Sequence, residues 1–240
     1  MVEGTTGAAA GEGPGVSGAA RSLRRLPKAH LHLHLDGSYP RAAVEALARK
    51  RGVPFSVPER FEDVWQFFAA YGEVPKLVET HEDLAALCRA LVEAEAGGGV
   101  VYMEPAIEPQ LYAPRLGSLG EVTRTMLSAF AEAARDHDVE VGAMLTINTD
   151  EDLAIAEDLA AIAASHAGKG ITALGTAGFV EPAGLGRFRR AAGIARAAAL
   201  PIVSHAGQTG GADSIAEALD ELGATRISHG FRAIESVDLV

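Results

Sequence analysis

The chain has few of the features that mark secreted or membrane proteins. It contains a single cysteine, Cys88, so no disulfide can form within the chain, and the reducing cytoplasm is the expected location. Cys88 lies in the apolar pattern of residues 83–96 and is expected to be a small core residue. No apolar run reaches the length needed to span a bilayer.

The first residues also lack the order of a signal peptide. Small residues come first and the basic cluster of Arg21, Arg24 and Arg25 follows them, whereas a signal peptide begins with its basic residues and continues into an apolar stretch. We therefore expect residues 1–24 to form a disordered tail and residues 25–240 to form the folded part.

Positive charge is scarce. The chain has 21 Lys and Arg against 32 Asp and Glu, a net charge of −11 at pH 7. Such a surface repels phosphate backbones and anionic lipids, which argues against nucleic acid or a membrane as partner.

Short apolar runs alternate with longer Ala-rich segments of helical period. This alternation, without hairpin signals, predicts parallel β/α units, and strands apolar on both faces are typical of a barrel covered by helices. The expected strands are 29–35, 100–107, 140–147, 171–176, 201–204 and 225–228. The expected helices between them include 116–134, 150–164, 186–198 and 211–222.

The connection between the first two expected strands is longer than the others. It contains helical patterns over 42–51, 61–71 and 82–96, and the middle one is rich in aromatic residues such as Trp65 and Tyr71. A helical lid over 41–97 and ordinary packing of helices on the barrel are both consistent with this pattern.

Histidines gather where the expected strands end. His32 and His34 are two residues apart in a strand, so they point to the same face, and His205 and His229 follow later strands. Three imidazoles with one open position are typical of a catalytic metal site, so His32, His34 and His205 are the predicted ligands. The competing interpretation is a set of histidines that bond only to the backbone. His30 lies deeper in the strand and is not counted as a ligand. The histidines at 81, 137 and 166 lie in expected helical or turn segments and are predicted to be at the surface.

Several segments together resemble the adenosine deaminase family of metal-dependent purine hydrolases. The segment L-P-K-A-H-L-H-L-H-L-D-G-S at 26–38 is similar to that family's first strand. The later segments T-H-E-D-L, V-V-Y-M-E, H-A-G and R-I-S-H-G follow in the family's order, so that the resemblance covers residues 26–240.

The resemblance implies a (β/α)8 TIM-barrel fold and one zinc ion that activates water for attack on C6 of adenine with release of ammonia. It implies that His229 orients or deprotonates that water. It also implies that Asp36 hydrogen-bonds a ribose and that the Gly178 backbone meets the purine ring of a nucleoside-like substrate.

Three departures accompany the resemblance. Gln208 stands where the family has the glutamic acid that protonates the ring, and a glutamine cannot donate a proton. The motif after Glu104 lacks the family's arginine. The segment at 175–180, where the fourth expected strand ends, lacks the acidic pair that is common in the family. Only six β/α units are found before Val240, whereas the family's last metal ligand and a second aspartate follow the eighth strand.

These departures leave three functions open. The first is a zinc-dependent deaminase lineage with weakly held zinc and negligible adenosine turnover. Gln208→Glu alone is not expected to restore deamination of adenosine. The second is an inactive ligand-binding or regulatory homologue. The third is a metal-dependent hydrolase with changed chemistry. Because six strands leave open edges, a second polypeptide that closes the barrel is also expected.

Overall fold

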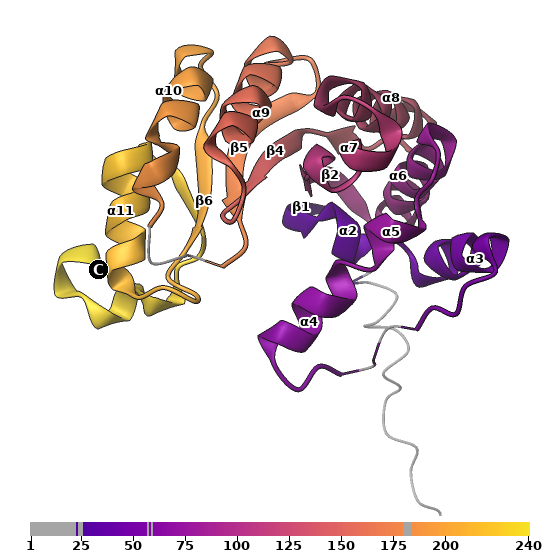
Figure 1. Cartoon of the computed structure of the whole chain (residues 1–240), viewed down its shortest axis with the longest axis horizontal. Helices are drawn as coiled ribbons and strands as arrows, with labels where there is room; N and C mark the ends of the chain where they lie inside the picture. The colour runs from indigo at the N-terminus through magenta and orange to yellow at the C-terminus, as the bar shows by residue number, and fades with distance from the viewer. Residues whose placement is uncertain (1–22, 24–25, 57, 59, 180–183) are drawn as a thin grey trace, which may run out of the picture.

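The computed structural model describes residue 23 and residues 26–56, 58, 60–179 and 184–240. Apart from Leu23, the expected tail over 1–24 lies outside the described residues. Parallel strands form one curved sheet with helices on its convex face, as Figure 1 shows. The predicted α/β barrel architecture is confirmed.

The strands follow one another around the arch in the order β1-β2-β4-β5-β6-β7, and every pairing is parallel. The short β3 pairs with β2 beside this path. The strands are β1 (Lys28–His34), β2 (Val100–Ile107), β3 (Glu140–Val141), β4 (Ala143–Asn148), β5 (Ile171–Ala177), β6 (Ile202–Ala206) and β7 (Arg226–His229). Their carboxyl ends meet at one end of the barrel, where the histidines were expected.

The strand predicted over 140–147 is split in two at Gly142. A Cβ at this position would lie 2.5 Å from Cγ2 of Thr172 and 3.1 Å from the hydroxyl of Tyr102. Only glycine therefore lets the chain pass so close to both side chains. The interruption separates β3 from β4, and a register shift of β4 against β5 follows between Ala143 and Met144.

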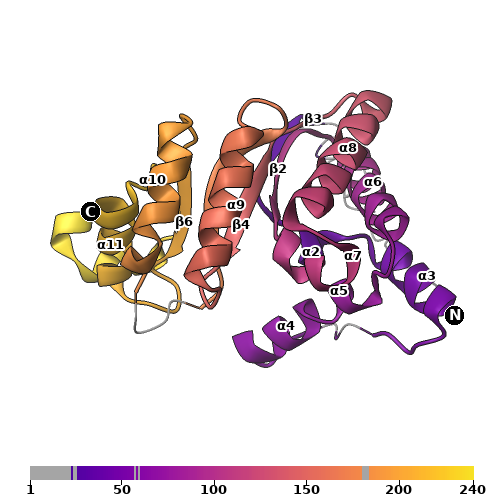
Figure 2. The same ribbon diagram turned by 45° about the horizontal axis from the view of Figure 1, so that its top comes forward.

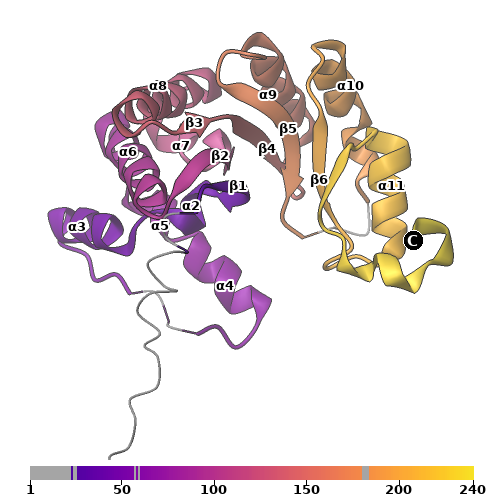
Figure 3. The same cartoon turned by 180° about the vertical axis from the view of Figure 1, so that it is seen from behind.

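The long helices cover the convex face of the sheet (Figure 3). They are α6 (His81–Gly97), α8 (Leu119–His137), α9 (Leu153–Ser165), α10 (Arg189–Ala197) and α11 (Ala212–Leu222). Thr80 and Ser118 begin α6 and α8 with capping boxes, in which their side chains accept a hydrogen bond from the backbone N–H three residues on. Cys88 is fully buried in the core between helices and sheet, as predicted.

The connection between β1 and β2 is helical, as its sequence pattern indicates. Its helices before α6 are α2 (Leu35–Ser38), α3 (Arg41–Arg51), α4 (Val64–Tyr71) and α5 (Val74–Leu77). Helix α4 lies at the open side of the arch, away from the convex face (Figures 1 and 2). None of its residues is buried, and its Trp65 ring lies 5.2 Å from the ring of Phe179, which follows β5.

The remaining elements are short. They are η1 (Pro109–Leu111), α7 (Ala113–Leu116), η2 (Gly186–Phe188), η3 (Phe231–Glu235) and η4 (Val237–Leu239). Within the described part of the chain, no helix is long and apolar enough to cross a membrane.

The interior of the arch contains an apolar layer and an ion pair. Ala106, Met144, Ala173 and Val203, one from each of four strands, form a small buried cluster. Arg226 of β7 pairs with Glu104 of β2, two strands that are not neighbours in the sheet. Among the described residues, β1 and β7 end the sheet, and neither pairs with a further strand.

Candidate metal centre and active site

Three imidazoles converge at the carboxyl ends of β1 and β6. The Nε2 atoms of His32 and His34 are 3.2 Å apart, and they lie 3.0 Å and 2.9 Å from Nε2 of His205. His205 is buried and His34 half-buried, whereas His32 is exposed, so the group opens to one side. The structure thus brings together the three predicted ligands.

The surroundings of His205 set which nitrogen points inward. Its Nδ1 donates to the carbonyl oxygen of Thr176 at 2.6 Å, so its Nε2 carries the lone pair toward the other two rings. Burial, reinforced by neighbouring imidazoles, lowers the pKa of His205 to about 3 and that of His34 to about 4. Burial also lowers the pKa of His32. The imidazoles are therefore neutral at pH 7, the form that binds metals.

These residues fit a divalent metal. Zn–N distances of about 2.0–2.1 Å in a tetrahedral site place the nitrogens about 3.3 Å apart, close to the three separations found here. The three nitrogens cannot satisfy one another with hydrogen bonds, because each offers one proton or one lone pair. A cation among them removes that conflict. Neutral imidazole nitrogens suit zinc.

His229 stands beside this group at the end of β7. Its ring lies 4.9 Å from that of His32 and 5.1 Å from that of His205, measured between ring centres. Its φ of 70° lies in the left-handed region, which a residue with a side chain rarely adopts. Such backbone strain persists where the surrounding structure imposes it, and it is concentrated at functional sites.

Asp36 lies just past β1 among tyrosine hydroxyls. It is 1% exposed and accepts hydrogen bonds from the hydroxyls of Tyr112 and, at 3.2 Å, Tyr71. Burial raises its pKa to about 6 despite these two donors. Both carboxylate oxygens are thus engaged inside the protein, and the predicted contact with a ribose stays a prediction.

A second buried carboxyl, Glu108, follows β2. Its Oε1 lies 3.2 Å from the Tyr71 hydroxyl, and its Oε2 lies 3.4 Å from Nδ2 of Asn148 at the end of β4. Gly178 follows β5 with a φ of 98°, and a Cβ there would lie 2.3 Å from Oδ1 of Asn148. These contacts join one continuous series of neighbours, which we call the polar wall: Asp36, Tyr71, Glu108, Asn148 and Gly178.

The comparisons with known proteins agree with this geometry. A family model described as adenosine deaminase matches residues 27–240.

The chain belongs to the adenosine deaminase family.

Three known proteins illustrate the relationship. The chain is 37% identical over 222 residues to an adenine deaminase of Chelativorans sp. (strain BNC1), covering 90% of this chain and 68% of that protein. The crystal structure of an adenine deaminase from Arthrobacter aurescens superposes with a TM-score of 0.77 at 29% identity, over 88% of this chain and 67% of that one. A zinc-bound amidohydrolase from Burkholderia ambifaria shares the fold, with a TM-score of 0.81 at 21% identity over 95% of this chain and 65% of that one.

Gln208 is the residue that the resemblance places at the position of the family's glutamic acid. It follows β6 directly after the buried segment 202–207 and is itself half-buried. Its amide can donate and accept hydrogen bonds but has no acidic proton.

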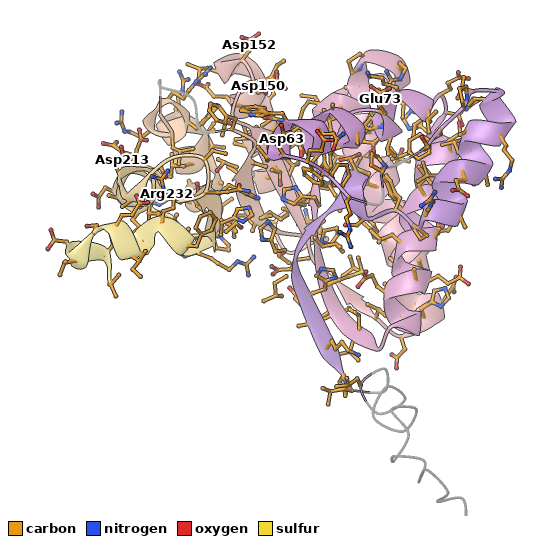
Figure 4. The ribbon with its side chains drawn as sticks, turned by 90° about the horizontal axis from the view of Figure 1, so that it is seen from below. Asp63, Glu73, Asp150, Asp152, Asp213 and Arg232 are labelled. Atoms are coloured by element: carbon orange, nitrogen blue, oxygen red, sulfur yellow. The ribbon has the colours of Figure 1, made fainter. Side chains whose placement is uncertain are left out.

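Acidic side chains surround the carboxyl ends of the strands in this deaminase relative. Figure 4 shows that Asp63, Glu73, Asp150, Asp152 and Asp213 lie at this end of the molecule, with Arg232 among them. Asp63 also begins α4 by accepting the N–H of Gln66 at 2.8 Å. The rim attracts cations and repels anionic ligands.

Sequence reasoning missed Glu108 and misjudged His81. Glu108 belongs to the segment E-P-Q at 108–110 just past a predicted strand, and that position was the available signal. His81 was expected at the surface but is half-buried, because Nδ1 contacts Oγ1 of Thr125 at 2.7 Å and Nε2 contacts the Leu116 oxygen at 2.8 Å. His166 is likewise half-buried, whereas His137 is exposed as expected.

Proposed function

We propose that the chain is a zinc-dependent hydrolase of C–N bonds in 6-aminopurines or related aminated rings, with impaired turnover. The observation that carries this proposal is the convergence of three neutral imidazole nitrogens within 3.2 Å of one another at the strand ends, beside His229. Membership of a deaminase family supports the reaction class.

His32, His34 and His205 would hold the zinc. When bound, zinc supplies a Lewis acid that lowers the pKa of a water molecule to about 7. The bond from His205 to the Thr176 oxygen keeps the ligand nitrogen free of its proton. His229, whose ring lies next to those of His32 and His205, would orient a water molecule or accept its proton.

Impairment is proposed because of Gln208. Addition of water to C6 of a purine needs a proton at the neighbouring ring nitrogen, and an amide at position 208 can donate a hydrogen bond but no proton. We expect ammonia release at least roughly 10²-fold slower than with a glutamic acid in this position.

The acidic rim favours an uncharged ring over a nucleotide. A phosphate at the barrel mouth would face Asp150, Asp152 and Asp213, and like charges repel each other over about 8–10 Å at physiological ionic strength. Adenine or a nucleoside carries no such charge. We therefore propose a free base or nucleoside as the ligand class.

A second candidate function is binding without turnover, and Gln208 favours it. Such a protein keeps the purine site but serves as a regulatory or ligand-holding homologue. The third candidate is a metal-dependent hydrolase with changed chemistry. Its substrate would have a leaving group that needs no proton from residue 208.

The test uses the 240-residue protein, loaded with zinc and freed of excess metal. Calorimetric titration with adenine, adenosine and adenosine monophosphate is expected to show binding of an uncharged purine and weaker binding of the nucleotide. Ammonia release is measured in parallel, with the Chelativorans adenine deaminase as reference. Turnover equal to that enzyme would refute impairment, and absence of both zinc and purine binding would refute the proposed function.

Two further expectations stay predictions. Zinc is expected to be held weakly, and a cytoplasmic location is expected from the single cysteine. We also retain the prediction that a second polypeptide covers the outer edges of β1 and β7, which no described strand pairs. Light scattering of the purified chain, alone and with candidate partners, measures that association.

A further inference from the structure

One ion pair crosses the interior of the arch. Arg226 of β7 pairs with Glu104 of β2, and Oε1 of Glu104 also accepts a hydrogen bond from the Tyr102 hydroxyl at 2.9 Å. The two strands are not neighbours in the sheet, so the arginine side chain extends across the arch. The Glu104 side chain is 10% exposed and that of Arg226 is 38% exposed. The carboxylate is therefore held inside the protein by two donors, and the guanidinium is the more accessible partner.

The register of β6 and β7 places Arg226 one layer below the predicted metal ligands. Ser228 pairs with His205, and Arg226 pairs with Val203, which lies two residues before His205 and belongs to the buried cluster inside the arch. Residues two apart in a strand point to the same face of the sheet. Arg226 therefore lies on the inner side of the sheet, about 7 Å further from the barrel mouth than His205.

The register of β1 and β2 places Glu104 in the same layer. Ala106 pairs with His34, so Glu104, two residues before Ala106, lies about 7 Å below this ligand along the strand. Ala106 also belongs to the buried cluster inside the arch, so Glu104 shares its inner face. Both partners of the ion pair thus lie in one layer below the imidazoles.

The charge of Arg226 acts on a predicted ligand. Burial first, and then the charges of His229 and Arg226, lower the pKa of His32. A divalent cation among the imidazoles would meet the same positive charge. Repulsion between a double and a single charge at about 7 Å changes a binding constant roughly 5- to 50-fold, for dielectric constants between about 80 and 40. The carboxylate of Glu104 opposes this field and holds the guanidinium toward β2.

We propose that the Glu104–Arg226 pair sets the affinity of the three-histidine site for its divalent cation: Arg226 lowers that affinity, and Glu104 limits the repulsion. Neither side chain is a predicted ligand, so both act through their charge and position. The inference rests on the proposed function, which places zinc on the three imidazoles, and deepens it by naming residues that regulate this site.

A purely structural ion pair predicts a different result. If the pair only held β7 against β2, loss of either partner would displace the strands and weaken zinc binding. If the charges act on the site, loss of the cation and loss of the anion change the affinity in opposite directions. The direction of the change therefore separates the two roles.

The experiment measures the zinc affinity of the 240-residue protein by competition with a chromophoric chelator. Arg226→Gln is expected to tighten zinc binding roughly 5- to 50-fold, and Glu104→Gln is expected to weaken it by a similar factor. The double variant loses both charges and should bind zinc much as the unaltered protein does. Arg190→Gln and Glu157→Gln are the matched controls, because they break an ion pair between α10 and α9 on the convex face and should leave the affinity unchanged.

Each outcome decides the proposal. Weaker binding in both single variants overturns it, assigns the pair a structural role and leaves the proposed function intact. Unchanged affinity in both, or equal changes in the matched controls, overturns it as well. If the unaltered protein binds no zinc, the proposed function and this inference fall together. Circular dichroism shows whether each variant is folded, and Arg226→Gln alone decides the direction if Glu104→Gln does not fold.

Discussion

Replacing Glu108 by glutamine should change how the stability of this protein depends on pH. The glutamine has nearly the shape of the protonated glutamic acid and can keep the contacts to Tyr71 and Asn148. It cannot ionise, however. The variant therefore isolates the free-energy cost of placing a charge at this buried position.

The sign and the size follow from linkage. Folding raises the pKa of Glu108 from 4.5 to about 8, so as the pH rises this carboxyl group ionises at a lower pH in the unfolded chain than in the folded protein. Stability from this group is complete below pH 4.5 and is lost as pH rises toward 8. Each pH unit in this window costs about 1.4 kcal/mol. Relative to Glu108→Gln, the unaltered protein should lose roughly 2–3 kcal/mol of unfolding free energy between about pH 5.5 and 7.5.

Urea denaturation followed by far-ultraviolet circular dichroism measures this difference at several pH values. Glu93→Gln, which changes an exposed glutamate on α6, is the matched control. Its unfolding free energy should change with pH in the same way as that of the unaltered protein. If the unfolding free energies of Glu108→Gln and the unaltered protein change with pH in parallel across this window, the pKa of Glu108 is the same in the folded and unfolded states. The argument that burial raises this pKa would then be wrong.

Three further predictions concern the metal site, a helix cap and the protein surface. His205→Ala should abolish bound zinc in elemental analysis while the exposed His137→Ala retains it, and equal zinc in both would exclude the proposed ligand set. Thr80→Ala removes half of the capping box of α6 and should lower the unfolding free energy by about 1 kcal/mol in urea denaturation, whereas an unchanged midpoint would mean that the cap adds nothing. Ile234 and Val237 are 83% and 94% exposed, so the purified chain is expected to self-associate through this apolar surface, and changing both to lysine should lower the mass that light scattering measures. An unchanged mass would contradict a role of this surface.

Local sequence patterns predicted the architecture because strands and helices have short periods. The alternation of apolar runs with Ala-rich helical segments placed the main strands and helices within a few residues of their observed bounds. The same period of two put His32 and His34 on one face. The split at Gly142 was not predicted, because it depends on Thr172 and Tyr102, which approach from other strands.

The candidate site was predictable only in part. Histidines at strand ends identified the ligand set, since the carboxyl ends of parallel strands in a barrel meet at one end whatever the loops do. The polar wall was not predictable, because Tyr71 and Glu108 are 37 residues apart and only the position of α4 brings them together.

The sequence by itself determined the strand–helix alternation, the histidines at the strand ends and the amide Gln208 where the resemblance implies an acid. The tertiary structure decided which other side chains those residues contact. His32 and His205 are 173 residues apart, yet their nitrogens lie 3.0 Å from each other. The burial of Glu108 between Tyr71 and Asn148 raises the pKa of its carboxyl group to about 8. Distances and burial depend on how distant segments pack, and no local period of the sequence encodes them.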